Sequence, residues 1–418
     1  MPGLLTIRSA TLIGAGASVF IGLYIRATLP PPASTRLFDR ELVRQLSLTG
    51  GLRENPSPIA PLLNVRAIVT GATSGLGREI ASELYALGAT VILASRSAKK
   101  ALTIVESIKK EYPDAPGTLD TGVLEVSSLK DVKEFADWYN SKYDNLHVLV
   151  NNAGIHYASI GMTPSPLADP SVKTVSNEGY DLAFATNYLG HFLLTRLLLD
   201  KMIETEREEG KPGRIVNVAS SYHLQNDGTM LAAQGDDMPL AARSDILTSS
   251  HRAKAYSNNK LAQVLHAKEL QRRIDSGSLV GRSGLKVFSS CPAWSSTAIL
   301  PDNAGGNWVS SLAFSAKAGI LGVLGAILDT RKFKGGEFVA VFKNEVSGQF
   351  WARPLMKLAT KLGVRDGLTN LLGMWILFTQ NRNYGYWSEP TSEEGEDAEL
   401  ARSLYEWSIK ATSKFVTP

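Results

Sequence analysis

A glycine-rich segment, Thr70–Gly77, constrains this chain more than any other feature of its 418 residues. It reads TGATSGLG, follows the apolar run Ala67–Val69 and precedes an amphipathic stretch. Small residues suit a tight turn at Gly71, a close backbone approach to phosphate at Gly75 and helix–strand packing at Gly77. A strand, a glycine loop and a helix in this order predict a site where a dinucleotide pyrophosphate meets the free N–H groups of a helix.

Short apolar runs alternate with longer amphipathic stretches from about residue 64 onward. We expect strands at Arg66–Thr70, Thr90–Ala94, Val123–Val126, His147–Val150, Arg214–Val218, Leu285–Ser289 and Glu337–Val341. We expect helices at Gly77–Leu87, Asp131–Tyr139, Phe192–Thr205 and Tyr256–Ile274. The alternation predicts an α/β protein with a doubly wound parallel sheet, the Rossmann fold, flanked by an N-terminal apolar segment and a helical C-terminal extension.

Three regions follow from this pattern. Residues 1–38 are expected to be an anchor or targeting segment with a linker, residues 39–343 the dinucleotide-binding catalytic domain, and residues 344–418 a helical C-terminal extension. Within the extension, Leu355–Thr379 is apolar, which fits core-packing helices or an element that covers the substrate or faces a membrane. A last amphipathic helix is expected near Leu400–Thr412.

The N-terminal region contains an uncharged run, Ala10–Ile25, between Arg8 and Arg26. A full membrane span needs about 20 apolar residues, so this run is short. We expect it to associate the protein with a membrane, at the endoplasmic reticulum, and the flanking arginines favour a cytosolic catalytic domain. A mitochondrial presequence and a cleaved secretory signal are the alternatives.

Charge and composition exclude other classes of function. The chain has 44 basic and 40 acidic residues, an excess too small to indicate nucleic-acid binding. Cys291 is the only cysteine, so an internal disulfide is excluded. The six histidines form no HxxxH or HxH pair, and we expect no metal site.

The residue at the end of the second expected strand indicates which nicotinamide cofactor the site takes. An NAD enzyme usually places an acid here for the ribose 2′-hydroxyl. This chain has Arg96, between Ser95 and Ser97, and a guanidinium can pair with a 2′-phosphate. Arg96 therefore favours NADP over NAD.

Two further segments carry groups that suit an alcohol–carbonyl reaction. Tyr256 and Lys260 are four residues apart and share one helix face. A lysine ammonium there should lower the pKa of the phenol, which makes Tyr256 a plausible proton donor and acceptor. Ser220 lies two residues after the expected strand Arg214–Val218, where it can donate a hydrogen bond to a carbonyl oxygen. Its neighbour Ser221 is the rival for this role.

The chain from about residue 64 to 343 resembles the short-chain dehydrogenase/reductase family, in its retinol-dehydrogenase-like and WW-domain-oxidoreductase-like branch. Five motifs appear in the family's order: Thr70–Gly77, Asn151–Gly154, Asn187–Thr195, Ile215–Ser220 and Ala255–Ala262. Two positions depart from the family, since Glu125-Val126 replaces Asp-Leu and Pro292-Ala293 replaces Pro-Gly. The first change puts the adenine contact in doubt, and the second should narrow the pocket.

The resemblance implies a role for each matching residue. Asn187 would hold a water that links Lys260 to solvent, Ser220 would orient the substrate oxygen, and Tyr256 would transfer the proton. The cofactor-binding residues would be Gly71, Thr73, Ser74, Gly75, Leu76, Gly77, Arg96, Asn152, Gly154, Tyr256, Lys260 and Thr297.

The function expected from these residues is an NADP-dependent oxidoreductase that moves a hydride between nicotinamide and an alcohol or carbonyl carbon. A bulky apolar substrate, such as a retinoid, sterol or lipid aldehyde, follows only by analogy and from the expected anchor. The alternative is a non-catalytic dinucleotide-binding sensor or a structural subunit of a membrane complex. An extended-branch epimerase or dehydratase is disfavoured because the loop GxxGxxG is absent. The sequence is compatible with a homo-oligomer and does not name the substrate.

Overall fold

The computed structural model describes residues 60–156, 173–225, 227–233, 237–245, 249–279, 283–292, 295, 316–328, 333–342 and 384–416. Its strands are β1 (Arg66–Thr70), β2 (Thr90–Ser95), β3 (Thr118–Val123), β4 (Val148–Asn151), β5 (Arg214–Val218), β6 (Lys286–Cys291), β7 (Phe338–Phe342) and β8 (Tyr384–Glu389). Its helices are α3 (Gly75–Ala86), α4 (Ala98–Glu111), α5 (Leu129–Lys142), α6 (Leu182–Phe184), α7 (Gly190–Glu209), α8 (Ser249–Asp275), α10 (Ala316–Gly319), α11 (Leu321–Leu328), α14 (Glu393–Glu396) and α15 (Ala398–Thr412). Shorter helical turns are η2 (Ala185–Leu189), η3 (Ser221–Gln225), η4 (Leu240–Ala242) and η5 (Ser413–Phe415).

The strands form one sheet in the order β3-β2-β1-β4-β5-β6-β7-β8. The strands from β3 to β7 in this order pair in parallel, and β8 pairs antiparallel with β7. The chain reverses its direction of travel across the sheet after β3, between β1 and β4. Ligands of such sheets bind outside the carboxyl ends of the strands at this reversal. The predicted doubly wound parallel sheet is confirmed.

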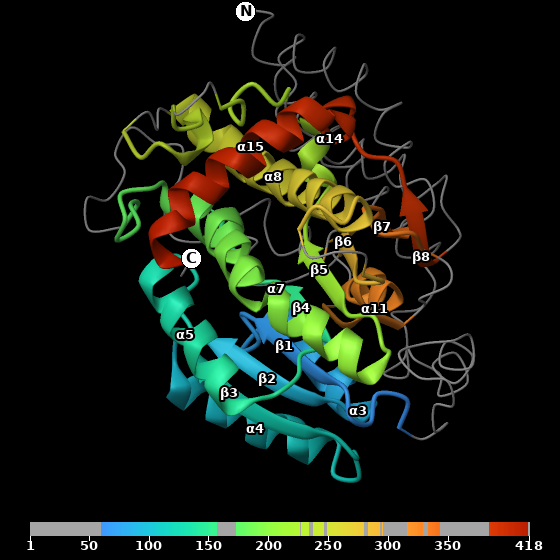
Figure 1. Ribbon diagram of the computed structural model, residues 1–418. Helices are drawn as coiled ribbons and strands as arrows, with labels where there is room; N and C mark the ends of the chain where they lie inside the picture. The colour runs from blue at the N-terminus through green and yellow to red at the C-terminus, as the bar shows by residue number, and fades with distance from the viewer. Residues whose placement is uncertain are drawn as a thin grey trace, which may run out of the picture.

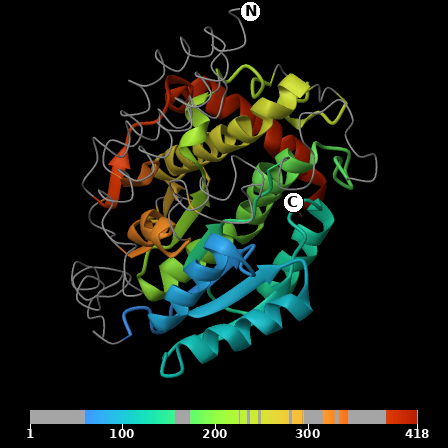
Figure 2. The same cartoon turned by 180° about the vertical axis from the view of Figure 1, so that it is seen from behind.

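Helices cover both faces of the sheet (Figures 1 and 2). Consecutive residues of β1 contribute to the cores on opposite faces of the sheet. Ala67 and Val69 belong to the core beneath α3, α4 and α11. Ile68 belongs to the core beneath α5, α7, α8 and α15. All three side chains are fully buried. A strand buried on both faces reads as a continuous apolar run, which is why the sequence located β1 correctly.

One predicted strand was misplaced. We expected Val123–Val126, but β3 is Thr118–Val123. β3 lies at the edge of the sheet, and only Gly122 within it is buried, so its own residues carry little apolar signal. The buried side chains of Leu124 and Val126 lie in the loop that follows, which explains the error.

The C-terminal region returns to the same sheet. Helices α14 and α15 agree with the predicted helical extension, and α15 lies along α8 (Figure 1). Strand β8, which the sequence analysis did not predict, extends the sheet beyond β7. Among the described residues, no helix combines the length and hydrophobicity needed to cross a membrane. Ala10–Ile25 and Leu355–Thr379 lie outside the described residues.

Candidate active site

The glycine loop adopts the conformation that its sequence predicts. Gly71 has a φ of +65°, and a Cβ there would lie 2.9 Å from Ala153 Cα. A Cβ on Gly77 would lie 2.4 Å from the Gly71 carbonyl oxygen and 2.5 Å from Asn152 Nδ2. All three distances are shorter than van der Waals contact, so the tight turn and the close helix packing need glycine at these two positions.

Thr70 connects the glycine loop to the segment after β4 through hydrogen bonds. Its Oγ1 accepts hydrogen bonds from the N–H groups of Asn152 and Ala153, each at 2.9 Å, and Asn152 Nδ2 donates to the Thr70 carbonyl at 2.8 Å. Oγ1 also lies 2.9 Å from Nε2 of His191, whose pKa burial lowers to about 3. His191 is therefore neutral at physiological pH, and the loop is held without a net charge beside it.

The first turn of α3 can receive a pyrophosphate. The N-cap residue Ser74 makes no side-chain capping bond, and the first turn contains no acidic residue. The N–H groups of this turn are therefore available, and they combine with the helix dipole to attract anions. Thr73, Ser74, Leu76 and Gly75, which has a φ of +53°, are at least partly exposed around this turn. These observations fit a dinucleotide cofactor.

Arg96 follows the end of β2, where the ribose of such a cofactor would lie. Its side chain is 75% exposed, and its Nε lies 3.7 Å from Glu125 Oε2. Glu125 is itself held by the N–H and hydroxyl of Ser127, at 3.0 and 2.8 Å. An exposed ion pair at this distance contributes little to stability, so the guanidinium can turn to another anion.

Ser220 and Tyr256 meet at the carboxyl end of β5. The Ser220 side chain lies near the phenol of Tyr256 and acts to lower its pKa. Ser220 Oγ also accepts a hydrogen bond from the Tyr222 N–H at 3.2 Å, which leaves the serine proton to donate. The rival Ser221 is buried, and its N–H donates to Cys291 Sγ at 3.2 Å. The geometry favours Ser220 as the residue that faces a substrate oxygen.

Lys260 lies one helical turn from Tyr256 and is only 3% exposed. Its ammonium donates to the Val218 carbonyl at 2.6 Å and to Gln263 Oε1 at 2.9 Å, and it lies 5.5 Å from the centre of the Tyr256 ring. Neither acceptor carries a charge. Burial therefore lowers the pKa of Lys260 to about 7.

The predicted direction of the Tyr256 pKa shift is wrong. Burial raises the pKa of the phenol, and the negative charge that Cys291 and Tyr222 can carry adds to this; the hydrogen bond from Ser220 opposes it. The Lys260 ammonium points to Val218 and Gln263, so its charge does not offset the desolvation of the phenol.

Asn187 lies in η2, a π-helical turn between α6 and α7. Single π-helical turns inside helices occur often at functional sites. Its side chain makes two hydrogen bonds to the backbone of Ile155. Nδ2 donates to the carbonyl at 2.9 Å, and Oδ1 accepts from the N–H at 2.8 Å. The structure thus joins Asn187 to the segment after β4; a water held between Asn187 and Lys260 stays a prediction.

Two aromatic rings flank the phenol of Tyr256. The His156 ring centre lies 4.9 Å from that of Tyr256, and the Tyr222 ring centre lies 5.9 Å away, both at steep interplanar angles. Burial lowers the pKa of His156, which favours its neutral form. Together the rings give the surroundings of Tyr256 an aromatic and uncharged character.

The structure brings most of the predicted residues to one edge of the sheet. Asn152 and Gly154 follow β4 beside the glycine loop, and both are partly exposed there. Thr297 and Ala293 lie outside the described part of the chain. Within the described ranges, no group of three side chains suited to binding a metal ion is found.

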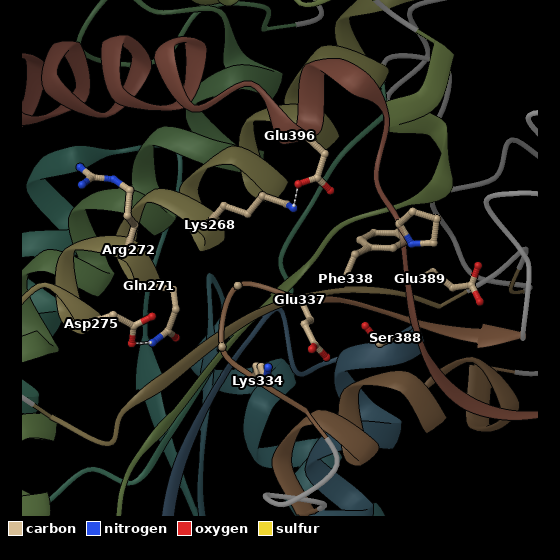
Figure 3. Close-up of a pocket in the computed structure, with 13 residues that line it drawn as sticks. Lys268, Gln271, Arg272, Asp275, Lys334, Glu337, Phe338, Ser388, Glu389 and Glu396 are labelled. Carbon is tan, nitrogen blue, oxygen red and sulfur yellow. Dashed lines mark hydrogen bonds and ion pairs between the residues drawn. The ribbon is translucent and has the colours of Figure 1, made fainter.

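A separate open groove of about 550 Å³ lies between the second half of α8, the start of β7 and the segment after β8 (Figure 3). Its lining includes Lys268, Arg272, Lys334 and Glu396 and none of the predicted site residues. The groove is therefore distinct from the candidate active site.

Sequence reasoning missed several residues that shape the site. Gln263 could have been found, since it lies three residues after Lys260 on the same helix. His156 and Tyr222 gave no signal, because only the tertiary structure brings their rings to Tyr256. His223 lies three residues after Ser220 and contacts it within the same turn, so its place in the sequence could have indicated this contact. Helix α8 also begins at Ser249, seven residues before the predicted start, because its first turns lack apolar periodicity.

The buried Lys260 makes stability depend on pH. Its pKa is about 7 in the folded protein and near 10.5 when exposed, so between these values the unfolded chain binds more protons. The free energy of unfolding should therefore rise with pH across this window, by about 2 to 4 kcal/mol, relative to a Lys260→Met variant. Urea unfolding at about pH 6.5 and pH 9 measures the difference. Met replacement of the exposed Lys254, on the same helix, is the control; a Lys260→Met curve that parallels the wild type would contradict the shift.

Comparison with known proteins places these features in a family. Residues 65–232 match the short chain dehydrogenase family. Short-chain dehydrogenase TIC 32 A of Brassica napus is 37% identical over 213 residues, which are 50% of this chain and 59% of that protein. Human retinol dehydrogenase 11 is 34% identical over 227 residues (54% and 59%), and human polyprenol dehydrogenase is 36% identical over 230 residues (53% and 59%). The chain thus spans less than two thirds of the length of these curated relatives.

Solved structures agree with the fold. A protein of Mycobacterium paratuberculosis superimposes with a TM-score of 0.54 at 24% identity, covering 87% of this chain and 98% of that one. A short chain dehydrogenase of Salmonella enterica gives a TM-score of 0.50 at 21% identity, covering 68% and 98%. At these identities the likeness shows the fold alone. Residues 65–232 therefore match the short-chain dehydrogenases, and the glycine loop and the cluster of Ser220, Tyr256 and Lys260 agree with that match.

Proposed function

We propose that this protein is an NADP-dependent oxidoreductase that transfers a hydride between nicotinamide and an alcohol or carbonyl carbon. The observation that carries the proposal is the convergence of Ser220, Tyr256 and buried Lys260 at the same sheet edge as the glycine loop. Two hydroxyls that converge on one point can hold and protonate a single oxygen atom.

The residues have separate tasks in this reaction. When bound, the cofactor supplies or accepts the hydride. Ser220 donates a hydrogen bond to the substrate oxygen, and its own oxygen is fixed by the Tyr222 N–H. Tyr256 gives a proton to that oxygen during reduction and takes it back during oxidation. Lys260 would hydrogen-bond the nicotinamide ribose, Asn152 and Gly154 would line the cofactor groove, and Thr297 would contact the cofactor.

NADP rather than NAD is proposed because of Arg96. Its guanidinium is exposed at the end of β2, and its partner Glu125 is 3.7 Å away, so it is free to pair with a 2′-phosphate. The pyrophosphate would lie on the uncapped first turn of α3.

A bulky apolar alcohol or carbonyl is the proposed substrate class. The uncharged rings of His156 and Tyr222 beside Tyr256 suit an apolar group next to the reacting carbon. Relatives named as retinol dehydrogenase and polyprenol dehydrogenase support the same class.

A substrate screen tests the proposal. The full-length protein is incubated with NADPH or NADH and a panel of retinoid, polyprenoid, sterol and short aliphatic carbonyls, and the loss of reduced-cofactor absorbance is followed. We expect turnover of a long apolar carbonyl with NADPH. A folded protein that binds NADPH and reduces none of the panel would favour the alternative, a non-catalytic dinucleotide sensor or structural subunit.

Membrane association through Ala10–Ile25 is also proposed, with the catalytic domain on the cytosolic side of the endoplasmic reticulum. The support is the uncharged run itself, together with the arginines at its ends. Deleting residues 1–35 should move the protein from the membrane to the soluble fraction of lysed cells. A shortened mature protein in the mitochondrial matrix would instead support a presequence.

A further inference from the structure

His223 closes the turn that carries Ser220. Its backbone N–H donates to the Ser220 carbonyl at 3.1 Å, and its ring Nδ1 lies 2.7 Å from the same oxygen. The side chain is fully buried. One residue therefore makes two contacts to the main chain of the serine that faces the substrate.

The other side of the His223 ring contacts the C-terminal region. The N–H of Ser392, which caps α14, points to Nε2 at 3.4 Å, and the Phe338 ring packs against the imidazole at 4.8 Å between centres. A backbone N–H can only donate and a carbonyl can only accept. These partners therefore require a neutral imidazole with its proton on Nδ1.

The C-terminal region is well placed to hold this histidine. Strand β8 pairs with β7, where Glu389 is opposite Phe338, and Lys268 of α8 forms an ion pair with Glu396 of α14 at 2.6 Å (Figure 3). Farther along, Ser408 of α15 is hydrogen-bonded to Tyr188, the neighbour of Asn187, at 2.9 Å. The region thus contacts the chain beside two of the four predicted catalytic residues.

We propose that His223 is a positioning residue for Ser220, and that through it residues 384–416 form part of the catalytic unit. The proposal rests on the proposed function, in which the Ser220 hydroxyl holds the substrate oxygen. Catalytic groups must be placed within a fraction of an ångström, and a displacement of about 1 Å can cost about 100-fold in rate. The imidazole fixes the turn by bridging its carbonyl to a segment more than 160 residues away in the sequence.

Two substitutions at His223 separate positioning from packing. His223→Phe keeps an aromatic ring against Phe338 but loses both ring hydrogen bonds. His223→Asn retains an N–H donor near the position of Nδ1. We expect kcat to fall about 10- to 100-fold in the Phe variant, with the Kd for NADPH unchanged, and to recover to within about fivefold of the wild type in the Asn variant. Equal kcat values in wild type and Phe variant would overturn the proposal, as would equal losses in both variants.

Ser392 offers a matched pair of variants in the C-terminal region. Its φ of −65° is the value that proline adopts, so Ser392→Pro removes the N–H donor without a change of backbone angle. Ser392→Ala removes only the hydroxyl cap on Gly395 and keeps the N–H. We expect kcat to be about threefold lower in Pro than in Ala. Identical kcat values would exclude a contribution of the Ser392 contact.

A readout that needs no turnover separates this inference from the proposed function. The ¹⁵N NMR shifts of the His223 ring, assigned by its loss in His223→Phe, should show an Nδ1-protonated neutral tautomer. In Ser392→Pro the Nε2 shift should change. If the wild type reduces no carbonyl, the proposed function fails. The ¹⁵N shifts alone then test whether His223 connects Ser220 to Ser392. An Nε2-protonated ring would overturn it.

Discussion

Tyr256→Phe is expected to lower kcat by about a thousandfold while NADPH binds with nearly unchanged affinity. The ring remains between His156 and Tyr222, so the packing of the site is preserved. The proton that must pass to the substrate oxygen is lost, and so is the interaction of the phenol with Ser220. Steady-state kinetics with the carbonyl found in the screen, together with NADPH fluorescence titration, measure both effects.

Tyr222→Phe is the matched control for this experiment. Its hydroxyl is removed from a ring that touches Tyr256, and the Tyr222 contact to Ser220 is made by the backbone N–H, which the substitution leaves in place. We expect the control to keep a kcat within a few-fold of the wild type. Similar turnover by Tyr256→Phe and the wild type would reject Tyr256 as the proton donor.

Arg96→Asp is expected to invert the cofactor preference. The Kd for NADPH should rise by about 100-fold, because charge-assisted hydrogen bonds to the 2′-phosphate are lost and a like charge replaces them. The neighbouring carboxylate of Glu125 adds to the repulsion. The new carboxylate can accept a hydrogen bond from a ribose 2′-hydroxyl, so NADH should bind equally well or better. Titration of both cofactors measures the ratio.

Lys99→Asp controls for general electrostatics. It reverses a charge three positions away, on an exposed part of the first turn of α4. We expect only a small change in the ratio of NADPH to NADH affinity. An Arg96→Asp protein that still prefers NADPH would show that the 2′-phosphate is bound elsewhere.

Local sequence determined those parts of the site that depend on short-range geometry. Gly71 and Gly77 could be identified because glycine adopts a positive φ at the lowest cost and alone has no Cβ to clash at a 2.4 Å approach to a carbonyl oxygen. Tyr256 and Lys260 could be placed on one face because a helix repeats every 3.6 residues. β1 and β5 were located because strands buried on both faces contain short apolar runs, Ala67–Val69 in β1 and Ile215–Val216 in β5.

The tertiary structure decided everything that depends on which distant segments meet. The direction of the Tyr256 pKa shift depends on burial and on the neutral partners that Val218 and Gln263 give to Lys260. Strand β8 was not predicted from the sequence because it forms by pairing with β7, more than 40 residues earlier. His223 contacts Ser220 nearby but also Ser392, 169 residues later. The contact between His223 and Ser392 leaves no periodic pattern of residues in the sequence. It forms only when the folded domain packs the turn after β5 against the C-terminal region.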